Sequence, residues 1–362
     1  MIEETLTGED SGLTPAPLSK RKEITGSHGL ERLNPILSDF VFSAYDAFGL
    51  PTGDRHAPFN LLRMAVMDPQ YHAEFLERIG HTIKEHQGTL WFDVFSRAWT
   101  TIPYDAPVDS ATFDAPQILG DNGLMARYSC SLETGVHSFQ QVVTDKNYGM
   151  PTLVNKARNK TRQGLRNCTA GQLDPRDLGD AGVQLHADTL IRQGRRLPND
   201  FAAYWKNYFK AAAASPAVTA WAAWHDGELA AYLLSFRAGS REYISIVRSS
   251  ANKLKYRPNN AMLFTFLEWA MARDEISEVS IGLQSLQPGG ESLDLFKRGL
   301  GFQERPIGQR IELRRSLKTA IPRPVASLAA ATLKFLPGGE KQARLTGALK
   351  WYASQPKIRP AA

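Results

Sequence analysis

Three strand-like segments follow one another between residues 217 and 249, and they leave little freedom for the fold of the second half of the chain. They are AVTAWAAWHD, ELAAYLLSFRA and REYISIVRS, all rich in apolar, aromatic or β-branched residues. Asp226-Gly227 separates the first two, and an Asp-Gly pair is typical of a two-residue hairpin turn because both positions need positive φ. Gly239-Ser240 separates the last two. The pattern predicts an antiparallel meander of three strands.

A helix, a strand, a second helix and a last strand follow the meander. The first helix, from about Asn259 to Arg273, is apolar nearly all round, which suits a helix packed on a sheet. VSIGL, ESLDLFKRGLGF and IGQRIEL complete the order β-β-β-α-β-α-β. Upstream, ARYSCSLE and VHSFQQVVTD predict a hairpin around Thr134-Gly135. Further helices are expected at about 151–168, 182–194 and 200–214. We therefore predict an α/β fold with a mixed, mostly antiparallel sheet flanked by helices.

Composition divides the chain into four regions. Residues 1–30 are polar and are expected to form a flexible tail. Residues 31–125 are expected to form a helical N-terminal region, with YHAEFLERIGHTIKEH as one of its helices, and a connector rich in Pro and Asp. Residues 126–316 form the predicted main domain, and residues 317–362 form a basic helical tail.

The positive charge of the chain lies in that tail. The whole chain carries +6, whereas residues 317–362 carry +7, so residues 1–316 are close to neutral. PVASLAAATLKFL and ARLTGALKWY in the tail have amphipathic character. The tail therefore either packs on the main domain or meets an acidic membrane surface, tRNA or an acidic carrier protein. No DNA partner is expected.

Several classes of protein are disfavoured by the sequence. No stretch of 18 apolar residues is present, and the first residues are acidic, so we expect a cytoplasmic protein. The two cysteines, Cys130 and Cys168, have no partners at metal-ligand spacing, and we expect free thiols and no metal site. The sequence also lacks four common catalytic or nucleotide-binding motifs: GxSxG, HExxH, GxxxxGK[ST] and a GxGxxG after a strand.

Three segments resemble a known family. LDLFKRGLGF at 293–302 is similar to the late segment of GNAT domains, in which a helix carries Phe-Lys and ends in Gly-Phe. YGMPTLVNKARNKTRQGLRN at 148–167 resembles the Lys/Arg-rich helix that opens the transferase half of FemAB-like proteins, and YRPNNAMLF at 256–264 resembles the start of their long helix. The chain thus resembles an N-acyltransferase of the GNAT superfamily, in its FemAB-like branch.

The resemblance implies acyl transfer from a thioester, acetyl-CoA or another acyl-CoA, to a small-molecule or peptide amine, without a covalent enzyme intermediate. In the family the site lies where the central strands part, and backbone N–H groups of strand 242–249 are the expected oxyanion donors. Side chains at strand ends and loops around that point are candidates for proton handling: Tyr243, Ser249, Gln284 and Lys297. Residues near the start of the long helix are candidates for holding the donor phosphates: Ser250, Arg257, Asn259 and Asn260.

Two alternatives stay open from the sequence. Acetyl-CoA enzymes of this superfamily commonly carry a glycine-containing loop before the long helix, but residues 248–261 contain no glycine. One alternative is FemAB-type transfer from aminoacyl-tRNA to a cell-wall precursor, with the basic helix and tail contacting phosphates. The other is a GNAT-fold module that has lost its donor site and binds a partner.

Overall fold

The computed structural model describes residues 68–95, 97–192, 194–285, 291–333 and 340–358. Contacts divide the chain into two units, residues 1–8 with 67–362 and residues 9–66. All described residues belong to the first unit. The tail expected at residues 1–30 and the helices expected before Met67 lie outside the described residues.

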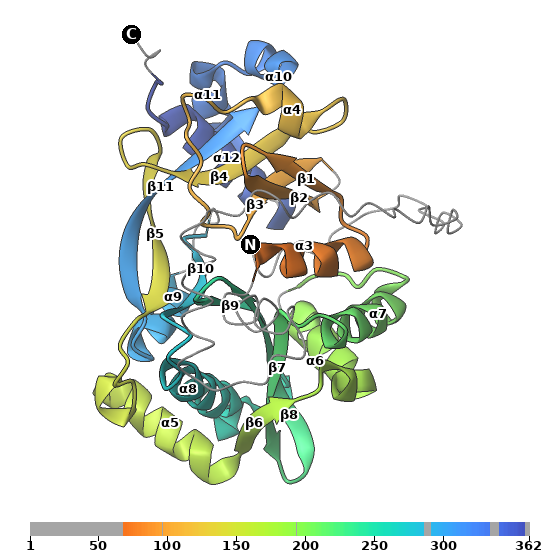
Figure 1. The fold of residues 1–362 in the computed structure, drawn as a ribbon, viewed down its shortest axis with the longest axis vertical. Coiled ribbons are helices and arrows are strands. Elements are labelled where there is room, and N and C mark those ends of the chain that lie inside the picture. Colours follow the sequence, from red (N-terminus) through yellow and green to blue (C-terminus); the bar gives the residue numbers. More distant parts are fainter. Residues whose placement is uncertain (1–67, 96, 193, 286–290, 334–339, 359–362) are drawn as a thin grey trace, which may run out of the picture. The chain divides into compact units, whose positions relative to one another are not determined.

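The strands of the described part form one sheet. They are β1 (Ile83–His86), β2 (Thr89–Phe95), β3 (Ala98–Ile102), β4 (Met125–Cys130), β5 (Val136–Val143), β6 (Thr169–Leu173), β7 (Val218–His225), β8 (Glu228–Ala238), β9 (Arg241–Ser249), β10 (Glu278–Leu283) and β11 (Gln303–Leu313). Their order is β1-β2-β3-β4-β11-β5-β10-β9-β8-β7-β6 (Figure 1). Neighbours pair antiparallel except β3 with β4 and β9 with β10. This sheet confirms the predicted fold class.

Helices flank the sheet. They are α3 (Pro69–Arg78), α4 (Ala115–Leu119), α5 (Asn155–Asn167), α6 (Gly179–Arg192), α7 (Phe201–Ala213), α8 (Pro258–Met271), α9 (Glu291–Gly299), α10 (Arg315–Ala320), α11 (Arg323–Leu333) and α12 (Glu340–Ser354). Short 3-10 helices are η1 (Met150–Thr152), η2 (Pro175–Leu178) and η3 (Ala251–Tyr256). The predicted order from the meander to the last strand, β7-β8-β9-α8-β10-α9-β11, is observed. Among the described helices, none combines the length and apolar composition needed to cross a membrane.

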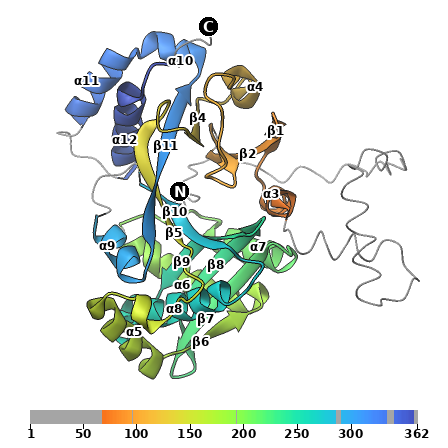
Figure 2. The ribbon, with the colours of Figure 1, turned by 60° about the vertical axis from the view of Figure 1, so that its left-hand side comes forward.

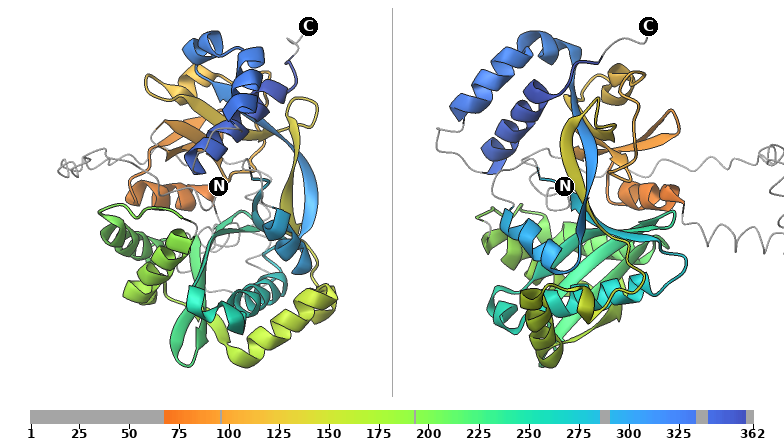
Figure 3. Two further views of the ribbon diagram at one scale, coloured as in Figure 1. Left: turned by 180° about the vertical axis from the view of Figure 1, so that it is seen from behind. Right: turned by 90° about the vertical axis from the view of Figure 1, so that its left-hand side faces the viewer.

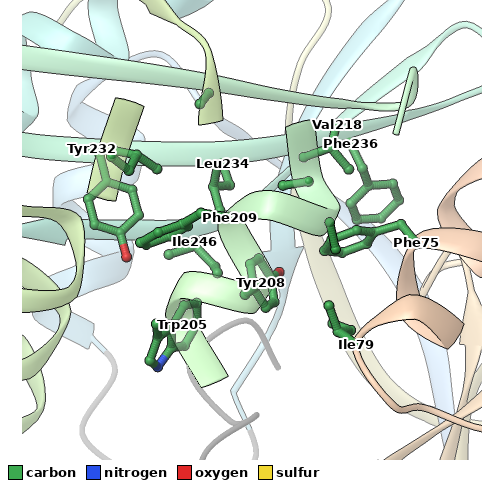
Figure 4. Packing of buried hydrophobic residues seen from close by; sticks show 14 of the residues in the cluster. Phe75, Ile79, Trp205, Tyr208, Phe209, Val218, Tyr232, Leu234, Phe236 and Ile246 are labelled. Atoms are coloured by element: carbon green, nitrogen blue, oxygen red, sulfur yellow. The ribbon is translucent and has the colours of Figure 1, made fainter. Parts of the chain in front are cut away.

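Two hydrophobic cores lie on the two faces of strands β7, β8 and β9. On one face, α8 buries Phe266 and Leu267 against Leu233 and other apolar residues of the strands. On the other face, α3, α6 and α7 cover the sheet, and the aromatic side chains of α7 pack on β8 and β9 (Figure 4). Complete burial of such side chains contributes about 1.5–3 kcal/mol each. The sheet is therefore held firmly where β8 and β9 run side by side.

The predicted hairpin around Thr134-Gly135 is wrong, because β11 lies between β4 and β5. β11 pairs antiparallel with both strands, and the two views in Figures 1 and 2 show it between them. Two glycines permit this close approach: a Cβ on Gly135 would lie 2.6 Å from the backbone nitrogen of Gln309, and one on Gly308 would overlap the carbonyl of Ser131. The turn residues between two strands do not show whether a third strand, distant in sequence, lies between them.

The N-terminal region is less helical than expected. The helix predicted over residues 71–86 ends at Arg78, and Gly80 follows with φ +99°, a conformation that ends a helix readily. Residues 83–102 instead form β1, β2 and β3, which extend the main sheet through the parallel pair of β3 with β4. The sheet thus crosses the boundary expected near residue 125.

The C-terminal helices pack on the sheet. Ile311 and Leu313 of β11 form a core with Ala326, Leu349 and Tyr352 from α11 and α12 (Figure 3). The C-terminal helices therefore pack on the main domain, which was one of the two alternatives expected for the tail. Both cysteines are free and buried, as expected.

Candidate active site

β9 and β10 part in the middle of the sheet. Their parallel register contains three pairs, and Tyr243 with Ser280 is the last of them. β9 continues to Ser249 and β10 to Leu283 without further pairing between them. Because N–H groups of alternate residues in an antiparallel strand point to opposite sides, those of β9 that face away from β8 have no strand partner beyond Tyr243. Such N–H groups are suitable donors to an extended ligand or an oxyanion.

A β-bulge lies at the same place in β9. Ile244 pairs with Ser235 and Ile246 with Leu234, so Ser245 has no partner residue on β8. Its Oγ donates a hydrogen bond to the carbonyl of Leu234 at 2.9 Å. A bulge redirects neighbouring side chains and N–H groups, and bulges are common next to active sites.

The end of β9 and the start of α8 bring several predicted residues together. Asn259 Nδ2 donates to Ser249 Oγ at 3.1 Å, and Ser250 follows directly with its side chain buried. Arg257 is the N-cap of α8 with φ +62°, and Pro258 is the first helical residue. The helix begins one residue before the start expected at about Asn259, because Pro258 fits the first helical position.

Three polar atoms at the start of α8 are buried and have no hydrogen-bond partner among the described residues. They are Arg257 Nε, Asn259 Oδ1 and Asn260 Nδ2, and the side chain of Asn260 is only 5% exposed. An unsatisfied buried polar group costs about 1–3 kcal/mol. Three such atoms at the positive end of a helix dipole indicate a place where a ligand supplies the missing partners.

Helix α5 packs directly on this helix start. A Cβ on Gly164 would lie 2.6 Å from the carbonyl oxygen of Arg257, so only glycine permits the observed approach. Thr161 and Gly164 are the buried residues of α5, whereas Leu165 is 40% exposed. The glycine lets the two helices approach more closely than a larger residue would.

The outer face of α5 is cationic. Lys156, Arg162 and Arg166 are exposed, and the helix contains no Asp or Glu. Arg158 instead donates to the carbonyl oxygens of Met150, Pro151 and Leu153 and so secures the segment before the helix.

Gln284 and Lys297 lie on the β10 side of the parted strands. Gln284 accepts a hydrogen bond from Ser138 Oγ at 3.1 Å through its Oε1. Lys297 is buried on α9, and its Nζ lies 3.4 Å from the carbonyl oxygen of Ile281 in β10. Gln284 and Lys297 thus contact β5 and β10, whereas Ser249 and Asn259 contact each other where β9 ends and α8 begins.

Tyr243 belongs to a buried polar network. It is 0% exposed, and its Oη donates to Asp105 Oδ1 at 2.9 Å. Asp105 Oδ2 also accepts from Arg241 Nη1 at 2.6 Å and from Gln140 Nε2 at 2.8 Å. Burial, and secondarily the nearby Asp105 carboxylate, raises the pKa of Tyr243, which keeps its proton. The residue thus supports the strands at the point where they part.

Glu242 is a second buried group at this point that sequence reasoning missed. Its side chain is 1% exposed and accepts a hydrogen bond from Ser235 Oγ at 2.6 Å. Burial raises the pKa of the Glu242 carboxyl to about 7, against smaller lowering effects of Ser235, Arg237 and Thr219. Its strand position alone offers no signal, because an alternating pattern does not distinguish a buried polar side chain from an exposed one.

Comparison with known proteins finds a family similar to part of this chain. Residues 155–290 match the family model described as acetyltransferase (GNAT) domain. This match agrees with the resemblance of these residues to the GNAT superfamily. The matched segment contains the parted strands and the start of α8.

Solved structures with a similar fold include three proteins with related descriptions. FemX is 13% identical, with a TM-score of 0.48 over 77% of this chain and 98% of FemX. L-PGS from Bacillus licheniformis is 11% identical, with a TM-score of 0.43 over 70% of this chain and 94% of that one. A tandem GNAT protein from the clavulanic acid biosynthesis pathway is 11% identical, with a TM-score of 0.39 over 77% and 96%. No curated protein matches the sequence.

Proposed function

We propose that this protein transfers an acyl group directly from a thioester, an acyl-CoA, to an amine, as a FemAB-like member of the GNAT superfamily. The observation that carries the proposal is the start of α8, where three buried atoms have no partner within the described part of the chain: Arg257 Nε, Asn259 Oδ1 and Asn260 Nδ2. Phosphate oxygens would accept from the two nitrogen atoms, and the Arg257 cation and the helix dipole would offset their charge. The amide-containing arm of the donor would then follow β9, whose outward N–H groups lack a strand partner.

In the transfer step, the amine nitrogen attacks the thioester carbonyl carbon, the C–S bond breaks, and the sulfur leaves with the electron pair. Backbone N–H groups of β9 near the bulge at Ser245 stabilise the oxyanion of the tetrahedral intermediate. The proton lost by the nitrogen must reach the sulfur. Ser249 is the proposed donor to the sulfur, because its Oγ already accepts from Asn259 Nδ2 and its own O–H remains for donation. Gln284 and Lys297 are proposed to contact the acceptor from the β10 side.

The thermal unfolding midpoint with coenzyme A, acetyl-CoA and octanoyl-CoA tests this proposal. A ligand at 100 times its Kd adds about 2.7 kcal/mol of stability. For a unit of roughly 300 residues this raises the midpoint by about 4 °C. The rise should be lost in Arg257→Glu and Asn260→Ala and kept in Asn207→Ala, a change of an exposed asparagine on α7. No rise with any thioester would remove acyl-CoA as the donor.

A second candidate donor, aminoacyl-tRNA, is favoured by the cationic face of α5. Lys156, Arg162 and Arg166 lie on the helix that packs against the start of α8, so a polyanion bound there would place its end near the same site. If thioesters fail, salt-dependent tRNA binding that is weakened by Lys156→Glu with Arg162→Glu, but not by Lys206→Glu on α7, would identify this donor. Failure of both donors would leave the binding-module alternative.

A further inference from the structure

A pocket lies on the opposite face of the sheet from α8, between α3, β2, β3 and the strands β8 and β9. Its volume is about 70 Å³ on a scale where one water molecule takes about 10–15 Å³, so it holds a group of several heavy atoms, and it opens to the surface. Most of the wall is apolar, with Leu76 and Ile79 from α3, Phe236 from β8 and Ile246 from β9. Figure 4 shows Ile79, Tyr208, Phe236 and Ile246 close together in the surrounding core. The pocket is thus built from elements far apart in the sequence.

The pocket reaches the place where β9 and β10 part. Ser245, the bulge residue of β9, and Ile246 both line it. Tyr104 lines it too, and its Oη lies 2.8 Å from the Oγ of Ser280, the β10 residue of the last registered pair. A group that reaches the bulge from the α8 side would therefore meet a group held in this pocket.

The lining contains no carboxylate, ammonium or guanidinium group, and its His81 Nδ1 lies 3.2 Å from Asp93 Oδ1. None of its fourteen residues, all from the described part of the chain, is Asp, Glu, Lys or Arg. A phosphate, carboxylate or ammonium group placed there would lose its hydration without a compensating charge, which costs several kcal/mol. The pocket therefore disfavours the phosphates of a nucleotide and suits an uncharged group.

Two polar atoms of the lining have no hydrogen-bond partner among the described residues, Thr101 Oγ1 and His72 Nδ1. Both side chains are more than nine-tenths buried. The His72 ring stacks on Phe236 with 3.6 Å between ring centroids, which fixes its orientation. Burial, and secondarily the nearby His81, lowers the pKa of His72 to about 3, so its ring is neutral at pH 7. The polar side chains within the apolar wall are therefore neutral and enclosed.

We propose that this pocket binds an uncharged, mainly apolar group of the reacting substrate. The proposal rests on the transfer site proposed above, because it places the bound group beside the bulge of β9. Two sources share this chemistry: the acyl chain of the donor and the apolar body of the acceptor. A sugar nucleotide or another phosphorylated group does not fit this lining.

Binding of the neutral fluorophore N-phenyl-1-naphthylamine to the full chain tests the pocket without any turnover. We expect saturable binding that weakens at least ten-fold in Ile79→Glu, which places a carboxylate in the wall, and in Ser245→Leu, which fills the end near the bulge. Leu328→Glu, at a position on α11 that is 67% exposed, is the matched control and should leave binding unchanged. Circular dichroism verifies that each variant folds, and Ser245→Leu keeps the test valid if Ile79→Glu does not fold.

Displacement of the fluorophore then identifies the source of the bound group. Displacement by octanoyl-CoA but not by coenzyme A or octylamine assigns the pocket to the acyl chain, and displacement by octylamine alone assigns it to the acceptor. Displacement by neither compound, or equal fluorophore binding in wild type and both pocket variants, overturns the proposal. The fluorophore experiment does not depend on the proposed donor site. If coenzyme A does not bind that site, the thermal unfolding midpoint will not rise when coenzyme A is added.

Discussion

Replacing Glu242 by glutamine should change how the stability of the protein depends on pH. In the folded state the pKa of this carboxyl is raised from 4.5 to about 7, so the folded chain binds more protons than the unfolded chain between these values. The stability contribution is complete below pH 4.5 and is lost as the pH rises through 7. A shift of this size corresponds to about 3 kcal/mol, since one pKa unit is worth about 1.4 kcal/mol. Glutamine keeps the acceptor for Ser235 Oγ and removes the titration.

Urea unfolding of both proteins at pH 5 and pH 8 measures this effect. The free energy of unfolding of Glu242→Gln relative to wild type should rise by about 3 kcal/mol between the two pH values, because only the wild type has a buried carboxylate at pH 8. Glu77→Gln, at an exposed position on α3, is the control and should show no such change. The same stability difference at pH 5 and pH 8 would refute the raised pKa and with it the closed environment of Glu242.

Two further substitutions test the packing and the network around the site. Gly164→Ala should cost about 1–3 kcal/mol in chemical denaturation, because its Cβ would lie 2.6 Å from the carbonyl oxygen of Arg257, whereas Gly171→Ala, with no atom within 4 Å of the added Cβ, should cost far less. Tyr243→Phe removes the hydrogen bond to Asp105 and should lower the free energy of unfolding by about 1–2 kcal/mol; an unchanged value would show that Asp105 is satisfied by its other partners.

The sequence predicts those parts of the fold that depend on local patterns. The meander was predictable because a turn residue separates each pair of its strands, and Asp226 and Gly227 indeed have φ of +52° and +78°. The sequence did not predict which strands lie beside β4 and β5. β11 lies between them, and its position depends on close backbone contacts at Gly135 and Gly308. Local alternation fixes which face of a strand is apolar but does not determine its neighbour.

The same limit applies to the site. Ser249 and Asn259 are in contact because only a short connection, with the 3-10 helix η3, separates the end of β9 from the start of α8. Asp105 was not predictable, because its contact with Tyr243 joins residues 138 positions apart. Tyr243 itself is a strand residue with a functional group, and the sequence alone does not distinguish a tyrosine at the site from one that supports it.

The pocket is lined by residues from two parts of the chain, one before and one inside the segment that matches the acetyltransferase domain. Ten of the fourteen lining residues precede residue 155, where the match to the acetyltransferase domain begins, and four lie inside it. The matched segment supplies the parted strands and the start of α8, which form the proposed donor site. Most of the pocket wall comes from α3, β2, β3 and the loop after β3, which the pairing of β3 with β4 attaches to the sheet. If the pocket holds the variable group of the substrate, residues 72–104 determine selectivity, and changes there should alter which substrate is used while leaving the binding of coenzyme A unchanged.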